Sequence, residues 1–111
     1  MLKLELVKEE KKENRTNKAI YKIYKIAEYT VESQKYEYEN DSYENINVVT
    51  DYNTKYLPDI YFDRNIFGLN KGEFKIQTTA YGAMKPEEIK EVIKGYEHAI
   101  EVVEVLTREF L

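Results

Sequence analysis

One segment near the C-terminus decides the fold: 86-PEEIKEVIKGYEHAIEVVEVLTREF-110. Its apolar residues recur every three or four positions, as they do along one side of an α-helix; they are Ile89, Val92, Ile93, Tyr96, Ile100, Val103, Leu106 and Phe110. Pro86 suits the first position of a helix, and Glu87 and Glu88 complement the positive end of the helix dipole. We therefore predict one long amphipathic helix from Pro86 to about Phe110.

A glycine, Gly95, stands in the middle of this predicted helix. Glycine inside a helix costs up to about 1 kcal/mol relative to alanine. A glycine kept at such a cost indicates that another element approaches the helix closely at this position, and we predict such an approach.

Apolar and polar residues alternate in several segments before the helix, and this period of two is typical of half-buried strands. The alternation predicts strands over residues 2–7 and 74–81, and residues 60–67 are a further candidate. The segment IYKIYKIAEYTV, residues 20–31, also fits a helical stripe. Because Tyr, Ile, Thr and Val favour a pleated surface, we predict a long strand there, with a helix as the alternative.

Polar and turn-forming residues are expected to connect these strands. The charged run 8–18 is predicted to be a solvated connection or an extended hairpin tip. Residues 33–34 are predicted to form a tight turn into a short strand over 35–39, on which Tyr36 and Tyr38 would share one face. Residues 40–58 are expected to be a long, partly ordered excursion.

A last connection, residues 68–72, has a glycine at each end and is predicted to be a turn. Together these elements predict an α+β fold, in which an antiparallel sheet of about four or five strands carries one long C-terminal amphipathic helix. The 111 residues fit a single domain, 1–111, because domains commonly contain about 100 to 150 residues.

The residue types present exclude several kinds of chemistry. The chain has no cysteine, so disulfides, thiolate metal sites and thiol nucleophiles are excluded. His98 is the only histidine, and no serine-hydrolase, zinc-protease, P-loop or dinucleotide-binding motif occurs. We therefore expect a protein that is not an enzyme and has no cofactor or metal ion; an enzyme with an unfamiliar carboxylate site is the alternative.

Hydropathy and charge bear on location and partners. No apolar run is long enough for a signal peptide or a membrane span, so a cytoplasmic protein without membrane contact is expected. The net charge is −4, and residues 26–63 hold nine acidic and only two basic side chains. Residues 1–25 are basic on balance, but glutamates interrupt them, so direct nucleic-acid binding is not expected.

The acidic middle of the chain is also rich in tyrosine: seven of the eleven tyrosines lie within residues 28–63. Tyrosine offers a large contact area with few rotatable bonds and a polar tip, and neighbouring carboxylates would present a phosphate-like field to a basic groove on a partner. The segment therefore predicts a partner-binding surface made of Tyr36, Glu37, Tyr38, Glu39, Asp41, Tyr43, Glu44, Asp51, Asp59 and Asp63. The alternative is that the tyrosines border the core and the acids are ordinary solvated residues.

The C-terminal third, EFKIQTTAYGAMKPEEIKEVIKGYEHAIEVVEVLTREFL, resembles the strand, TTxYG turn and amphipathic helix of small accessory proteins of phages and mobile elements in low-GC Gram-positive bacteria. Such proteins include anti-CRISPR inhibitors. The resemblance implies a DNA mimic in the host cytosol that blocks the nucleic-acid site of a CRISPR effector nuclease with its acidic, tyrosine-rich surface. A second hypothesis is a phage structural or assembly protein that forms a homodimer or larger assembly through a sheet edge or through the helix, near Val102, Val103 and Val105.

Overall fold

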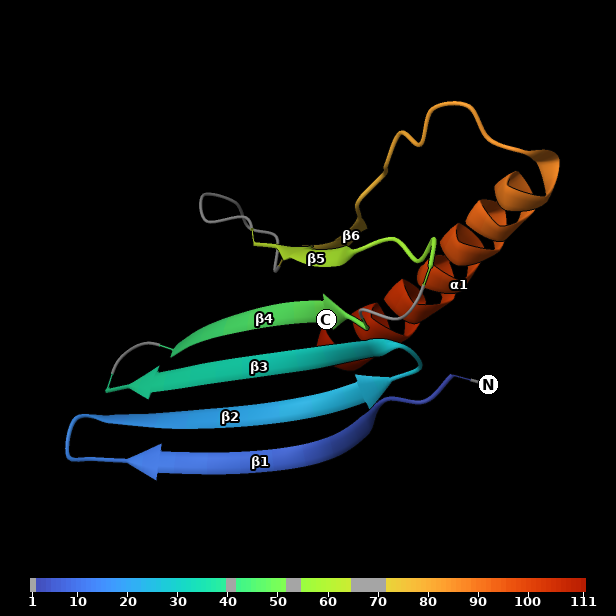
Figure 1. The fold of residues 1–111 in the computed structure, drawn as a ribbon. Coiled ribbons are helices and arrows are strands. Elements are labelled where there is room, and N and C mark those ends of the chain that lie inside the picture. The colour runs from blue at the N-terminus through green and yellow to red at the C-terminus, as the bar shows by residue number, and fades with distance from the viewer. Residues whose placement is uncertain (1, 40–41, 52–54, 65–71) are drawn as a thin grey trace.

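The computed structural model describes residues 2–39, 42–51, 55–64 and 72–111 (Figure 1). Its elements, in chain order, are β1 (Glu5–Glu13), β2 (Asn17–Ile26), β3 (Tyr29–Tyr38), β4 (Ser42–Thr50), β5 (Ile60–Asp63), β6 (Glu73–Ile76) and α1 (Pro86–Phe110). Strands β1 to β4 form an antiparallel sheet in that order, and β5 and β6 form a separate antiparallel pair. The predicted α+β class with one long C-terminal helix is confirmed.

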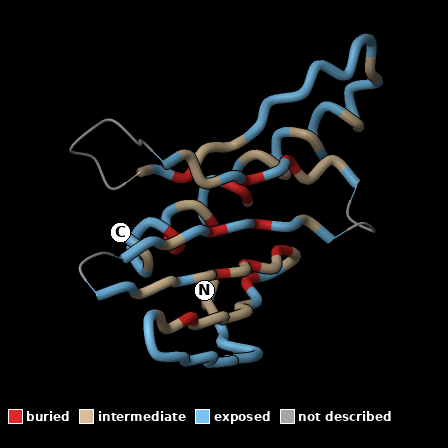
Figure 2. Tube along the Cα trace, turned by 90° about the vertical axis from the view of Figure 1, so that its left-hand side faces the viewer, coloured by how far each residue is buried: buried red, intermediate tan, exposed pale blue. Residues whose placement is uncertain are grey.

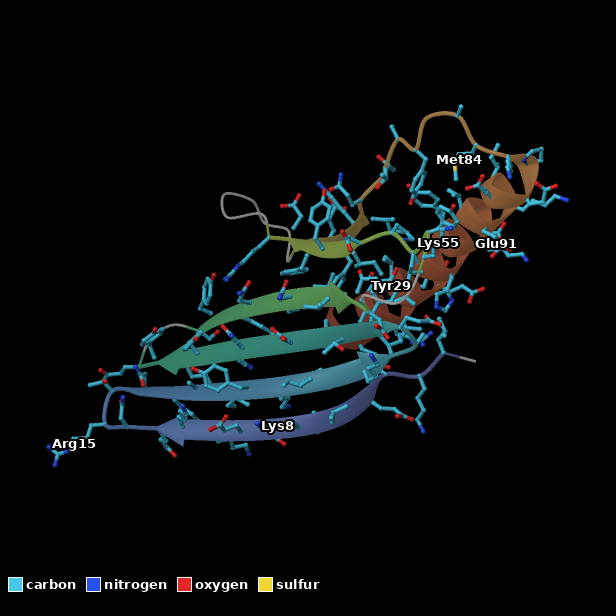
Figure 3. The ribbon with its side chains drawn as sticks, viewed as in Figure 1. Lys8, Arg15, Tyr29, Lys55, Met84 and Glu91 are labelled. Atoms are coloured by element: carbon cyan, nitrogen blue, oxygen red, sulfur yellow. The ribbon has the colours of Figure 1, made fainter. Side chains whose placement is uncertain are left out.

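The helix covers only one end of the four-stranded sheet and then projects beyond it (Figure 1). We call this the helix-side end; it contains the β2–β3 turn and the last residues of β4. The opposite end of the sheet extends away from the helix, so the molecule measures 59 × 31 × 23 Å along its principal axes. In Figure 3, Arg15 lies at the far tip of the β1–β2 hairpin, and Glu91 lies on the projecting part of α1.

The hydrophobic core lies at the helix-side end, between the sheet, the β5–β6 pair and α1 (Figure 2). The register of β2, β3 and β4 puts Ile26 opposite Tyr29, and Tyr24 and Val48 on either side of Val31. Because cross-strand partners share a face, these side chains meet on one side of the sheet. The buried core residues are Ile26, Tyr29, Val31, Ile46, Val48, Ile60, Phe74, Ala99, Val102, Val105 and Leu106.

Tyr29 is the largest fully buried side chain among the described residues. Its hydroxyl donates a hydrogen bond of 2.6 Å to the carbonyl oxygen of Pro58, just before β5. Burial, together with the nearby carboxylates of Asp59 and Glu28, raises the pKa of Tyr29 well above its ordinary value of 10.0. The hydroxyl therefore keeps its proton at neutral pH and ties the four-stranded sheet to the second one.

The prediction for the N-terminal segment is wrong in its bounds. The strand lies over Glu5–Glu13 rather than 2–7, and the connection shrinks to three residues, in which the Asn14 side-chain oxygen accepts hydrogen bonds of 2.9 Å from the N–H groups of Thr16 and Asn17. Every residue of β1 is exposed, so no apolar period marks it. Charged side chains are common on such edge strands, where they discourage pairing with another chain.

The segment predicted as one long strand, residues 20–31, contains two strands, and its helical alternative is also wrong. The chain turns at Ala27 and Glu28, where Ala27 has a φ of 50°. The turn predicted at residues 33–34 is wrong as well, because Ser33 is buried in the middle of β3. Alanine and glutamate carry no turn signal. The turn is held by long-range contacts: Ile26 and Tyr29 on either side of it are buried, and the Glu28 carbonyl accepts a 2.9 Å hydrogen bond from the N–H of Asp51.

The long, partly ordered connection predicted over 40–58 is also wrong for most of the residues that the structure describes there. Residues Ser42–Thr50 form β4, in which Ile46 and Val48 are buried between exposed neighbours. Residues 40–41 and 52–54 lie outside the described residues. The apolar period of β4 is short because only its helix-side end meets the core.

The remaining strand predictions are confirmed in part. β5 covers residues 60–63 of the predicted 60–67, and positions 65–71, including most of the predicted turn at 68–72, lie outside the described residues. β6 stops at Ile76, so a strand over 77–81 is wrong. There the backbone N–H of Thr79 donates a 3.0 Å hydrogen bond to the Tyr96 hydroxyl on α1 instead of to a strand.

The helix has the predicted bounds, but the stripe predicted to pack on the sheet is only partly buried. Leu106 of the stripe is buried, together with Ala99, Val102 and Val105, whereas Ile89, Ile93 and Ile100 are exposed. The reason is that the first half of α1 runs past the sheet (Figure 1). The close approach predicted at Gly95 is confirmed, because a Cβ atom there would overlap the carbonyl oxygen of Tyr56.

We expect Tyr29→Phe to lower the free energy of unfolding by about 1–3 kcal/mol, because it leaves the buried Pro58 carbonyl without its donor. Urea denaturation followed by circular dichroism measures the change. The matched control is Tyr61→Phe on β5, whose side chain is exposed and whose loss of a hydroxyl should stay within about 0.5 kcal/mol. Equal losses in the two variants would contradict the role given to the Tyr29 hydroxyl.

Gly95→Ala should destabilise the protein, although alanine is the better helix former. Overpacking against the Tyr56 backbone costs about 1–3 kcal/mol, whereas the gain in helix propensity is at most about 1 kcal/mol. The midpoint of thermal unfolding is the measurement. Glu97→Ala, at an exposed position two residues further on, is the control; a Gly95→Ala variant that is more stable than the parent would show that segment 55–58 does not press on the helix.

Candidate functional site

The two faces of the four-stranded sheet have different surroundings. One face carries the core at its helix-side end. The other, which we call the open face, displays the alternate residues of each strand, and α1 lies on the side away from it (Figures 1 and 2). The open face is therefore the broad surface of this sheet that the fold leaves uncovered.

Three tyrosines from three adjacent strands contact one another on the open face, and we call them the tyrosine row: Tyr21 on β2, Tyr36 on β3 and Tyr43 on β4. The rings of Tyr21 and Tyr36 meet edge to face, with 6.1 Å between centroids, and those of Tyr36 and Tyr43 are 6.3 Å apart. Ala19 lies directly across from Tyr36. Its small side chain leaves room for the rings.

Hydrogen bonds hold the polar tips of the row. The hydroxyls of Tyr21 and Tyr36 are 3.5 Å apart, and the Tyr36 hydroxyl donates a 3.4 Å hydrogen bond to the side-chain oxygen of Gln34. The hydrogen bond with Tyr21, followed by burial, raises the pKa of Tyr36 above its ordinary value of 10.0. The Tyr36 hydroxyl therefore keeps its proton at neutral pH and can both donate and accept hydrogen bonds.

A cation lies at each end of the tyrosine row. The Lys12 ammonium is 5.9 Å from the centre of the Tyr21 ring, and the Arg64 guanidinium is 4.1 Å from the centre of the Tyr43 ring. Arg64 also donates a 3.1 Å hydrogen bond to the backbone carbonyl of Glu44. These contacts favour fixed ring orientations, so little side-chain entropy would be lost when a partner binds.

The predicted site residues of β3 and β4 divide between the two faces, because side chains alternate along a strand. Tyr36, Tyr38 and Tyr43 lie on the open face, whereas Glu37 and Glu44 point to the other face. There Glu37 is 3.7 Å from the Lys35 ammonium. Glu44 accepts a 3.2 Å hydrogen bond from Ser33. The tyrosines and these two acids therefore do not form one continuous surface.

The other predicted acids that the structure describes lie outside the tyrosine row. Glu39 is exposed just beyond the end of β3, and Asp41 lies outside the described residues. Asp51 and Asp59 lie between β4 and β5, and Asp63 is the last residue of β5. Asp59 accepts a 2.8 Å hydrogen bond from Thr50, and Asp63 lies 2.6 Å from the Lys75 ammonium, whose pKa it raises.

Sequence reasoning missed Tyr21, Gln34, Lys12 and Arg64, which complete the cluster around Tyr36 and Tyr43. Tyr21 lies in a segment predicted to be a strand, so its strand character was available. Its contact with Tyr36 on the neighbouring strand could not be predicted, because the turn predicted at 33–34 gives the wrong pairing of the two strands. Arg64 contacts the row from beyond β5, a long-range placement that no local pattern indicates.

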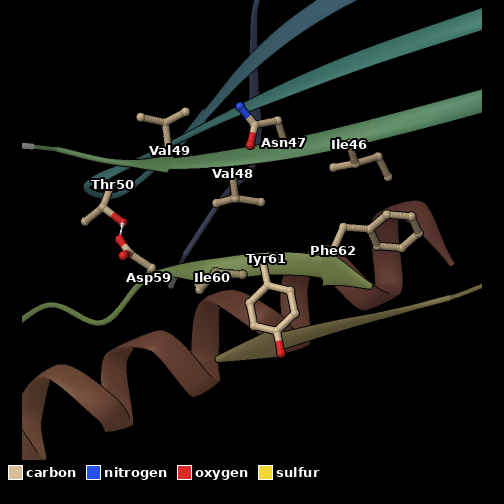
Figure 4. A pocket seen from close by; sticks show the side chains of 9 residues that line it. All are labelled: Ile46, Asn47, Val48, Val49, Thr50, Asp59, Ile60, Tyr61 and Phe62. Atoms are coloured by element: carbon tan, nitrogen blue, oxygen red, sulfur yellow. Dashed lines mark hydrogen bonds between the residues drawn. The ribbon is translucent and has the colours of Figure 1, made fainter. Parts of the chain in front are cut away.

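A shallow groove of about 440 Å³ runs between β4 and β5 (Figure 4). Residues 46–50 and 59–62 line it, and the hydrogen bond between Thr50 and Asp59 bridges one end. Ile46, Val48 and Ile60 on its walls are core residues. Asp59 is the single carboxylate among the lining residues, so the groove offers no acid–base pair for catalysis.

The single histidine joins two elements. His98 Nε2 on α1 lies 2.6 Å from a carboxylate oxygen of Glu28 in the β2–β3 turn. Within the described ranges, no group of three or more His, Cys, Asp or Glu side chains is placed to hold a metal ion. None of the helices in the described part of the chain is long and apolar enough to cross a membrane.

Comparisons of the chain with protein-family models, with curated proteins and with solved structures found no match in any of the three. Among the described residues, the tyrosine row is the surface feature that bears most directly on function.

Proposed function

We propose that this chain is a non-enzymatic protein-binding domain whose partner contacts the open face of the sheet at the tyrosine row. The observation that supports the proposal is the row itself: aromatic side chains that hold one another in place on a surface that the core leaves uncovered. Tyr43 and its neighbour Tyr38 are 47% and 51% exposed. Ordered, half-exposed tyrosines are typical of the centres of protein–protein interfaces.

The groups around the row favour a protein over a nucleic acid. A phosphate backbone requires a clear excess of positive charge. The register places three lysines and three glutamates on the open face, and Arg64 contacts Tyr43 at its edge; the six are Lys8, Lys12, Lys25, Glu5, Glu10 and Glu32. The amides of Gln34, Asn45 and Asn47 add neutral hydrogen-bonding groups. A mixture of tyrosine, amides and balanced charge is the composition of protein-binding surfaces such as antibody paratopes.

The narrower form of the proposal is an inhibitor of the anti-CRISPR type, which blocks the nucleic-acid-binding site of a CRISPR effector nuclease. Its support is the acidity of residues 26–63, which would complement a basic groove. The encounter would take place in the cytoplasm, and for a phage-encoded protein in the cytosol of the host. Because Glu37 and Glu44 lie on the face away from the tyrosines, the acids and the tyrosines are tested separately.

Truncation of the exposed tyrosines should abolish partner capture. Tagged parent protein and the double variant Tyr38→Ala/Tyr43→Ala are incubated with lysate of a low-GC Gram-positive bacterium supplemented with CRISPR effector nucleases, and captured proteins are quantified by mass spectrometry. We expect at least a tenfold loss of the specific partner, because aromatic anchors carry most interface energy. Tyr61→Ala, a comparably exposed tyrosine on β5, should retain capture. A partner held equally by all three proteins would contradict the proposal.

The narrower form predicts an electrostatic contribution. Replacing Glu37, Glu39 and Glu44 with Gln and Asp41 with Asn should leave folding intact, since surface changes cost within about 0.5 kcal/mol each. Partner binding should weaken, and its dependence on salt should shrink. Glu73→Gln/Glu109→Gln, at exposed positions elsewhere, is the control. If only the tyrosine variant loses binding, the result supports a protein-binding domain and contradicts the DNA-mimic inhibitor. If neither variant loses binding, both proposals are contradicted.

A further inference from the structure

Three isoleucines of α1 lie in solvent, although their spacing is that of a packed helix face. Ile89, Ile93 and Ile100 are 45%, 51% and 50% exposed. They are four and seven residues apart, and the half-buried Tyr96 continues the row between them. Single exposed apolar residues are ordinary, but an uninterrupted apolar row on a helix indicates a contact surface. We call these four residues the isoleucine stripe.

The core of the same chain cannot bury the isoleucines of the stripe. Gly95, Ala99, Val102 and Leu106 occupy a different side of α1, where Gly95 meets the Tyr56 backbone and the other three are buried. Rotating the helix to bury the stripe would expose this packed side. The three isoleucines of the stripe therefore stay exposed in the single chain, while Tyr96 at its edge accepts the hydrogen bond from Thr79.

The charges beside the stripe are arranged in two halves. At 100° per residue, one flank of the stripe carries Lys90 and Lys94 in the first half of the row, then Glu97 and Glu101 in the second half. All four are exposed. A helix with a basic half and an acidic half along one flank is complementary to itself when a second copy runs in the opposite direction. In a parallel two-fold pair the same flank of the two copies would lie on opposite sides of the contact, so these charges would not meet.

We propose that the isoleucine stripe is a homodimer interface, in which a second copy of this chain packs its own stripe antiparallel around a two-fold axis that crosses the stripe midway along it, level with residues 94 and 95. This axis pairs Ile89 of each copy with Ile100 of the other, and Ile93 with Tyr96. The two Ile89–Ile100 contacts are about 16 Å apart along the helices, at about 1.5 Å per residue. Lys90 of each copy then lies beside Glu97 of the other.

This inference concerns a different surface from the tyrosine row and does not depend on it. The contact involves one helix from each copy, so its area is that of the smallest protein interfaces. The proposed dimer is therefore weak and reversible, and the fraction of dimer rises with protein concentration. Of the three valines that the sequence suggested for self-association through the helix, Val102 and Val105 are buried in the core and Val103 packs against it. They take no part in this interface.

Sedimentation velocity over loading concentrations of about 5 to 500 µM, a range chosen to span weak association, tests the proposal. The parent protein should shift from one chain to two as the concentration rises. Ile93→Gln should raise the dissociation constant at least about tenfold, because the change occurs in both copies and removes apolar contact near the axis. Val7→Gln, at an exposed position on β1, should leave the constant unchanged. Circular dichroism checks that each variant is folded.

Charge reversal tests the antiparallel direction. Lys90→Glu and Glu97→Lys should each raise the dissociation constant about three- to tenfold, whereas the double variant should return it close to the parent value, because the two opposed charges are exchanged together. The tyrosine variant Tyr38→Ala/Tyr43→Ala should dimerise normally. The proposal is overturned by a parent protein that stays monomeric throughout, by a dimer insensitive to Ile93→Gln, or by a double charge variant weaker than both single ones.

Discussion

The hydrogen bond from the buried Tyr29 hydroxyl to the Pro58 carbonyl joins the two parts of this fold. It fixes where the chain enters β5, and through β5 it places β6 and Phe74 against the end of the helix. The Phe110 ring then packs between Tyr24 of the large sheet and Phe74 of the small one, with centroids 5.3 and 6.2 Å away. All of this apolar packing lies at one end of the sheet, which leaves the rest of the sheet free to present side chains to solvent.

The same core determines which side chains the open face displays. Ile26 and Tyr29 are direct partners across the β2–β3 hairpin, and their burial fixes the register of both strands. A slip of one residue would reverse the orientation of a strand's side chains. On β3 it would bring Glu37 to the open face in place of Tyr36 and Tyr38. The tyrosine row is thus a consequence of core packing at the other end of the sheet, so the proposed recognition would depend, through the register, on the same packing that stabilises the fold.

Elements whose apolar residues recur regularly along their whole length could be predicted from the sequence. Elements that are buried over only part of their length could not. The helix was predictable because an apolar row runs along its full length, and Tyr36 and Tyr38 were predictable as neighbours because two residues on one strand share a face. β1 has no buried position, and β4 meets the core only near its end, so neither shows a sustained period. The contact of Tyr21 with Tyr36 depends on a turn at Ala27, which carries no local signal. The isoleucine stripe could be recognised in the sequence as an apolar row. Its exposure could not be predicted, because it depends on how far α1 extends beyond the sheet.

The two proposed surfaces are compatible because the fold separates them. The isoleucine stripe lies on α1, whose first half projects beyond the sheet (Figure 1). The register places the tyrosine row toward the middle and far part of the sheet, on the open face. A two-fold contact between the projecting helices would leave both open faces accessible. A dimer would then offer two tyrosine rows to one assembly, and a second contact made by an already bound dimer is favoured by its raised effective concentration. Self-association would therefore strengthen partner binding by the tyrosine row, since one row alone makes only a small contact.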